Sequence, residues 1–153
     1  KKINNLDFKK FHPSGSLGEK LKTAEDLMLT RDKIPFIDEN RLMTKALKIM
    51  TEKKLGTLIV RNKKRYTTGI ITDGQIRRFN SKNINLNALK VKDVMTKNPI
   101  KIDKNILATK ALAIMNEKKI TSLLVVSDKD LKKKNKKIKG IIHIHFLLQN
   151  GIK

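Results

Sequence analysis

The sequence predicts a mixed α/β (α+β) protein made of two β-α-β-β-α repeats, packed sheet to sheet with pseudo-twofold symmetry. Two observations predict it: an internal repeat, and the same succession of helix and strand patterns in each copy. Residues 38–60 align with residues 103–125 without a gap, at an offset of 65, and 14 of the 23 aligned positions are identical. Similarity at a fixed period indicates a repeated structural unit. Because one unit this small buries little surface, we expect the two copies to share a core.

Each copy contains the same elements in the same order. One helix is predicted from apolar residues at i, i+4, i+7 and i+8, which share a helix face. These residues are Leu42, Ala46, Ile49 and Met50 in the first copy and Leu107, Ala111, Ile114 and Met115 in the second. Short apolar runs predict strands over 34–37, 57–60 and 67–71, and over 99–102, 122–126 and 138–142. Second helices are predicted over 73–79 and 143–149.

The repeat also suggests where the domains begin and end. Residues 1–22 are interpreted as a linker, 23–80 as the first repeat, 81–90 as a polar, Asn-rich connection, and 91–153 as the second repeat. A short helix is expected just after the connection. The chain begins with Lys-Lys and not with Met, so we interpret it as part of something longer.

The chain is strongly basic, with 36 Lys and Arg against 14 Asp and Glu, a formal net charge of +22. Such a charge raises nucleic acid as a partner. However, 30 of the 36 cations are lysine, and Lys, Asn and Ile together make up 62 residues, as AT-rich codon usage would produce. The arginines and aromatic residues of dedicated nucleic-acid surfaces are scarce. We therefore do not expect a nucleic-acid partner.

Two further features exclude classes of protein. Without cysteine, the chain has no disulfide scaffold, thiol nucleophile or Cys-ligated metal. No apolar run approaches the roughly 20 residues of a membrane helix, and no signal peptide is visible. We expect a soluble, cytoplasmic protein with no membrane partner and no cofactor. The basic loops 61–65 and 132–137 are predicted hairpin connections, either simply solvated or able to capture anionic metabolites.

The repeat resembles a known module. The doubled β-α-β-β-α order, with Asp-Leu-Met at 26–28 and Asp-Val-Met at 93–95 opening the copies, is similar to a tandem pair of cystathionine β-synthase (CBS) domains. The strand strings LGTLIV and ITSLLVV, each followed by Gly-Ile-Ile, also fit this family. The resemblance covers roughly residues 24–151 and implies the fold of a CBS-domain pair.

Three separate strings resemble the arabinose-5-phosphate isomerases. Residues 11–18 (FHPSGSLG) resemble that family's HPGG-[AS]-LG, with Ser14 replacing its first Gly; residues 69–78 (GIITDGQIRR) resemble G-I-x-T-D-G-D-L-R-R; residues 140–148 (GIIHIHFLL) resemble G-x-x-H-x-H-D-L-L. The family joins an N-terminal sugar isomerase domain to a CBS pair, and makes arabinose 5-phosphate for Kdo in lipopolysaccharide or capsule. The resemblance implies that the isomerase domain is missing here and that this chain is no enzyme by itself.

Clefts in modules of this kind commonly hold adenosine nucleotides, so the resemblance implies ligand-binding positions. These are Pro35, Thr57, Thr72, Gln75 and Arg77 in the first copy and Ser122, His143 and His145 in the second. The family keeps an Asp for the ribose hydroxyls, where a carboxylate accepts two strong hydrogen bonds. Here Gln75 replaces it in the first copy and Phe146 in the second, and only Gln75 retains hydrogen-bonding groups. The usual adenosine contacts are therefore weakened, more so in the second copy. Arg77 either contacts a phosphate or lies on a solvated helix face.

The histidines admit two interpretations each. By resemblance, His12 belongs to the isomerase active site, where an imidazole titrates in the range that proton shuttling needs. Without the isomerase domain, His12 is instead a tail residue with no partner. On an extended segment, His143 and His145 would share a face as metal ligands do. Since no Cys, Asp or Glu accompanies them, we expect structural or ligand-contacting imidazoles, and no metal.

The sequence thus predicts a regulatory, ligand-binding CBS pair of a D-arabinose-5-phosphate isomerase. A nucleotide or a nucleotide sugar such as CMP-Kdo would bind between the repeats and shift the attached isomerase domains. The other expected partners are that isomerase domain and further copies of the chain, in a homodimer or homotetramer. The alternative is a structural module that dimerises and binds no small molecule, which the two missing Asp residues favour.

Overall fold

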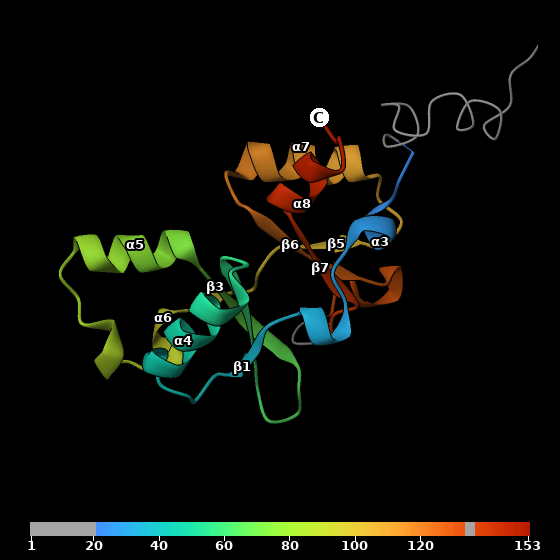
Figure 1. Cartoon of the computed structure of the whole chain (residues 1–153). Coiled ribbons are helices and arrows are strands. Elements are labelled where there is room, and N and C mark those ends of the chain that lie inside the picture. The colour runs from blue at the N-terminus through green and yellow to red at the C-terminus, as the bar shows by residue number, and fades with distance from the viewer. Residues whose placement is uncertain (1–20, 134–136) are drawn as a thin grey trace, which may run out of the picture.

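The structure, a computed structural model, describes residues 21–133 and 137–153 (Figure 1). His12 and the predicted linker up to residue 20 lie outside the described residues. One sheet has four strands in the order β1 (Phe36–Asp38), β2 (Thr57–Arg61), β3 (Thr67–Thr72) and β4 (Thr96–Lys97). The other has three strands in the order β5 (Lys101–Asp103), β6 (Ser122–Val126) and β7 (Gly140–His143). In each sheet the first two strands are parallel and the next pair is antiparallel. The repeated strand order is confirmed.

The helices repeat as the strands do. They are α4 (Met43–Lys53) and α7 (Ala108–Lys118), α5 (Asp73–Ser81) and α8 (Ile144–Gln149), the short α3 (Ala24–Leu27) and α6 (Val91–Val94), and three 3₁₀ turns (Arg31–Lys33, Leu86–Ala88 and Asp128–Asp130). The helices α4 and α7 end alike, at Lys54 and Lys119, whose left-handed backbone lets each amide donate back into the last turn. The predicted β-α-β-β-α order is confirmed in both repeats. No helix in the described part of the chain is long and apolar enough to cross a membrane.

The buried face of the first helix in each repeat begins one residue later than predicted. Leu42 and Leu107 lie in extended backbone just before the helices and are 49% and 44% exposed. Met43 and Ala108 are buried in their place. Helical spacing does not apply to a residue whose backbone is not yet helical. The prediction that these two leucines share the buried face is therefore wrong.

Alternate residues of the central strands face two different cores, because successive strand side chains point to opposite faces. On β2, Leu58 and Val60 join the core beneath α4, whereas Ile59 joins a cluster between the two sheets. That cluster contains Ile34, Ile59, Ile70, Leu124 and Ile141. Since both repeats contribute to it, the predicted sheet-to-sheet packing with a shared core is confirmed.

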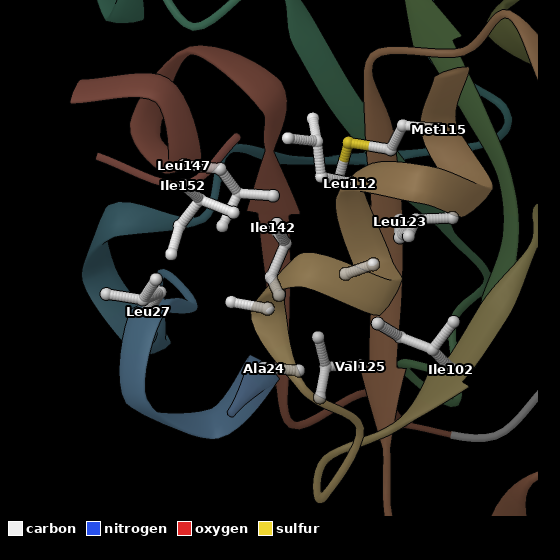
Figure 2. Packing of buried hydrophobic residues seen from close by; sticks show 12 residues of the cluster. Ala24, Leu27, Ile102, Leu112, Met115, Leu123, Val125, Ile142, Leu147 and Ile152 are labelled. Carbon is white, nitrogen blue, oxygen red and sulfur yellow. The ribbon is translucent and has the colours of Figure 1, made fainter. Parts of the chain in front are cut away.

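The segment that precedes each repeat packs on the other repeat. Ala24 and Leu27 of α3 are buried in the core of the second repeat, among the side chains of α7, β6 and β7 (Figure 2), and Leu29 pairs with Ile141. Figure 1 shows α3 beside this lobe. In return, α6 packs into the core of the first repeat and β4 pairs with β3. Each lobe is therefore completed by chain that precedes the opposite repeat.

Two equivalent glycines permit this exchange. A Cβ on Gly140 would lie 2.5 Å from Met28 Sδ and 2.6 Å from the Leu29 carbonyl oxygen. A Cβ on Gly69 would lie 2.6 Å from Met95 Sδ and 2.8 Å from a backbone oxygen. Each strand thus has a glycine where the crossing segment approaches its backbone closely.

Candidate functional site

A cleft with a volume of about 550 Å³ opens where the two repeats meet. Residues from both repeats line it. They are Lys54, Leu55, Gly56, Ile70, Thr72, Asp73, Gly74, Gln75, Arg77 and Arg78, then Thr96, Asn98, Pro99 and Ile100, then Lys119, Ile120, Thr121, Ser122, His143 and His145. We call this the inter-repeat cleft. A molecule held in it would touch both repeats at once.

Most of the ligand-binding positions predicted from the sequence meet in this cleft. Those that line it are Thr72, Gln75, Arg77, Ser122, His143 and His145. Thr57 is fully buried, and its hydroxyl hydrogen-bonds that of Ser122, its repeat equivalent, over 2.8 Å. Pro35 is also buried, and its carbonyl accepts the amide of Ile59. Neither Pro35 nor Thr57 lines the cleft.

The first turn of α5 forms one wall of the inter-repeat cleft. Thr72 and Gln75 form a reciprocal cap. The backbone amide of Gln75 donates to Thr72 Oγ1 over 3.4 Å, and the backbone amide of Thr72 donates to the side-chain oxygen Oε1 of Gln75 over 2.8 Å. Gln75 Nε2 also donates to the Val94 carbonyl and to Thr96 Oγ1. The side chain is 6% exposed. The side-chain amide of Gln75 is therefore occupied by internal partners. It has no unused N–H to donate to a ribose hydroxyl.

The histidine pair also lines the inter-repeat cleft. His143 is 5% exposed, and its Nδ1 accepts the backbone amide of His145 at the start of α8. The two rings lie 4.9 Å apart, centroid to centroid. Burial lowers the pKa of His143 from its ordinary value, the charge of His145 lowers it further, and Asp73 opposes both. A neutral ring that accepts at Nδ1 carries its proton on Nε2.

Positive charge predominates around the inter-repeat cleft. Four cations line it, Lys54, Arg77, Arg78 and Lys119, against one carboxylate, Asp73. The cleft is therefore suited to an anion. In the described residues, no group of three or more His, Asp or Glu side chains comes together as a metal centre would require.

Lys54 and Lys119 line the cleft but were not among the positions predicted from the sequence. The sequence does contain a feature that marks them, because Glu-Lys-Lys occurs at the end of the first helix in both copies, at 52–54 and 117–119. What the pattern did not reveal is that both helix ends turn toward the same cleft. Gly56, at φ +75°, was also missed; a Cβ there would lie 2.8 Å from Asp73 Oδ2. This glycine lets the carboxylate approach the junction of the repeats.

Two β-α-β-β-α repeats, joined sheet to sheet around a polar cleft, define a paired-repeat module. The model of the CBS domain family matches residues 24–82 and again residues 91–145. The chain belongs to the CBS domain family, and the resemblance inferred from the sequence is confirmed.

Curated relatives match nearly the whole chain. Uncharacterized protein RP505 of Rickettsia prowazekii is 39% identical over 146 residues, which are 95% of this chain and 43% of that protein. Arabinose 5-phosphate isomerase KdsD of Yersinia pestis is 37% identical, and that of Escherichia coli K12 is 35% identical, each over 147 residues with the same shares. The chain thus spans less than half the length of these relatives.

Solved structures share the fold. An uncharacterized conserved protein from Pyrococcus horikoshii superposes with a TM-score of 0.74 at 23% identity, covering 88% of this chain and 95% of that one. The CBS-domain pair of protein MJ0100, solved with 5′-methylthioadenosine and S-adenosyl-L-methionine, gives 0.71 at 19% identity over 87% and 99%. CBSX2 in complex with AMP gives 0.67 at 22% identity over 84% and 95%. At these identities the likeness establishes the fold.

Proposed function

We propose that this chain is the regulatory part of a D-arabinose-5-phosphate isomerase that serves Kdo, and hence lipopolysaccharide or capsule, synthesis. Its inter-repeat cleft binds a nucleotide or a nucleotide sugar such as CMP-Kdo. The observation that carries the proposal is the convergence of polar residues and four cations from both repeats in one cleft of about 550 Å³. Clefts of roughly 300–1,000 Å³ are typical of small-molecule sites.

The chemistry of the lining residues supports an anionic ligand. The cations at the two helix ends and on α5 attract phosphate or carboxylate groups. The neighbour solved with AMP supports the same class of ligand. Because the Gln75 side chain is occupied internally, a ligand held mainly through its charged groups, as a nucleotide sugar with a phosphate and a carboxylate can be, suits the cleft better than one held through its ribose.

Regulation follows from the ligand's position. A ligand that touches both repeats stabilises one relative arrangement of the two sheets, and an attached isomerase domain then responds to that arrangement. Coupling free energies of this kind are about 1–3 kcal/mol.

A thermal-unfolding panel with CMP-Kdo, CMP, AMP, ATP and arabinose 5-phosphate tests this function. At about 100 times its dissociation constant, a true ligand adds about 2.7 kcal/mol to the free energy of unfolding. We expect a selective rise in Tm that survives about 150 mM salt and is lost in Lys119→Asn. Asparagine tolerates the left-handed backbone of Lys119. The control Lys118→Gln removes one charge outside the cleft and keeps the response.

A second function, a structural dimerising module, has one observation in its favour. Gln75 is occupied internally, and Phe146 packs against the core of the second repeat, so neither replacement for the family's Asp is free to contact a ligand. This alternative predicts no selective response in the panel. It also predicts a dimer in sedimentation whose dissociation constant is unchanged by nucleotides.

A further inference from the structure

A second cleft, of about 250 Å³, lies at the opposite end of β2 from the inter-repeat cleft. Phe36 and Asp38 of β1 form one side, and Arg61, Lys63 and Arg65 of the β2–β3 hairpin form the other. We call it the hairpin cleft. None of its lining residues lines the inter-repeat cleft, so the two sites can be tested separately.

Arg61 is held in place by an aromatic ring. Its Cζ lies 4.1 Å from the centroid of Phe36, a stacking contact that orients the guanidinium. The side chain is half-buried. Stacking uses the flat face of the guanidinium and leaves the N–H groups in its plane to donate to a ligand.

The hairpin is shaped to bring a second arginine near the first. The Asn62 side-chain oxygen accepts the amides of Lys64 and Tyr66, and the Arg65 amide donates to the Asn62 carbonyl. Arg65 itself has a left-handed backbone, with φ 65°. Burial lowers the pKa of Arg61 below its usual value, and the charge of Arg65 lowers it further. The two guanidinium charges therefore repel each other in the hairpin.

In the part of the chain that the structure describes, these charges have no close acidic partner. Within residues 21–133 and 137–153, the ion pairs of 4 Å or less include none made by Arg61, Lys63 or Arg65. The one carboxylate of the cleft, Asp38, accepts the amide of Asn40. Three cations and one carboxylate leave the cleft with a net charge of 3 − 1 = +2.

We propose that the hairpin cleft binds a phosphate group, free or as a small monoester. Arg61 donates two parallel hydrogen bonds to the phosphate oxygens, and Lys63 and Arg65 balance the second negative charge. The phosphate relieves the repulsion between the arginines, and Asp38 lies where it accepts a hydroxyl of an ester. This site is independent of the function proposed for the inter-repeat cleft.

Amide chemical-shift titration of the chain with inorganic phosphate and with glycerol 3-phosphate, at about 150 mM salt, tests the proposal. We expect saturable shifts at residues 36–39 and 61–66 that fit one dissociation constant, separate from any shifts at the inter-repeat cleft. Arg61→Met keeps an unbranched side chain over Phe36 and weakens binding at least about tenfold; Arg65→Asn, which tolerates the positive φ, weakens it about threefold or more. Arg78→Ala, which removes an arginine from the other cleft, leaves the dissociation constant within about twofold.

The two ligands distinguish the sources of the phosphate. Equal affinity means a site for free phosphate; tighter binding of glycerol 3-phosphate means a site for monoesters. Either result supports the proposal. If Arg61→Met fails to fold, Arg61→Lys keeps the charge but loses the paired donors, and affinity should fall about fivefold. Shifts that spread over the lysine-rich surface without saturating, or unchanged binding in the folded Arg61 and Arg65 variants, would overturn it.

Discussion

At the scale of single residues, the replacement of a carboxylate by Gln75 has a clear structural consequence. The side-chain oxygen of Gln75 accepts the backbone amide of Thr72, and its side-chain nitrogen donates to the Val94 carbonyl and to Thr96 Oγ1. A carboxylate has no N–H to donate, so it would leave the Val94 carbonyl without this partner. Gln75 therefore fastens α5 to the end of α6 and the start of β4.

Gln75→Ala should lower the free energy of unfolding by about 1–3 kcal/mol, because it leaves buried polar groups without partners. Urea unfolding measures the change. The matched control is Gln149→Ala, at an exposed position of α8, with an effect within about 0.5 kcal/mol. Equal losses in the two variants would contradict the fastening role.

The buried histidine predicts a pH dependence. Since burial and His145 lower the pKa of His143 below 6.5, the folded state takes up a proton less readily than the unfolded state. The stability is complete above the unfolded value and falls as the pH drops from about 6.5 toward the lowered folded value, by at most about 1.4 kcal/mol per pH unit.

His143→Asn should remove this part of the slope, because Asn supplies a capping oxygen that does not titrate. The measurement is urea unfolding at a series of pH values between about 7.5 and 5.5. His145→Asn serves as the control and should retain a slope from His143. A wild-type stability that stays constant across this range would rule out the buried neutral imidazole.

At the scale of elements, the chain crossing over β7 depends on the absence of a side chain. Gly140→Ala places a methyl group against Met28 and against the backbone of Leu29, which cannot rotate away. We expect a loss of about 1–3 kcal/mol from overpacking, measured by thermal or urea unfolding. Gly69→Ala, against Met95, should behave in the same way.

Gly74→Ala is the matched control for these two variants. Its Cβ would lie 3.5 Å or more from its neighbours, and the residue is helical in α5. Alanine is favoured over glycine in a helix, so this variant should be neutral or more stable by up to about 1 kcal/mol. A large loss in this variant too would mean that the effect is not specific to the crossing segments.

At the scale of the whole molecule, the exchange of segments predicts effects in the repeat that is remote in sequence. Leu27 of α3 and Val94 of α6 are each 4% exposed, in the second and first cores respectively. Leu27→Ala should cost about 2–5 kcal/mol and lower hydrogen-exchange protection mainly in α7 and β7. Val94→Ala should lower hydrogen-exchange protection mainly in α4 and β2. Deprotection confined to the sequence neighbours of each substituted residue would refute the exchange.

The sequence by itself determined the repeat, the element order and the presence of a core shared by two sheets. These follow from local periodicity and from the identities between residues 38–60 and 103–125, which any fold of the chain must respect. Through the family resemblance it also indicated six polar positions of the inter-repeat cleft, namely Thr72, Gln75, Arg77, Ser122, His143 and His145. The start of the helix face was misjudged because spacing alone does not show where helical backbone begins.

Only the tertiary structure decided which repeat receives α3 and which receives α6. Both helices have similar sequences, and the choice depends on contacts with Gly140 and Gly69, far away in the chain. It likewise decided that Thr57 serves the repeat junction, that Gln75 is occupied internally, and that Lys54 and Lys119 face one cleft. Such contacts join residues distant in sequence, and the packing of the two sheets determines them.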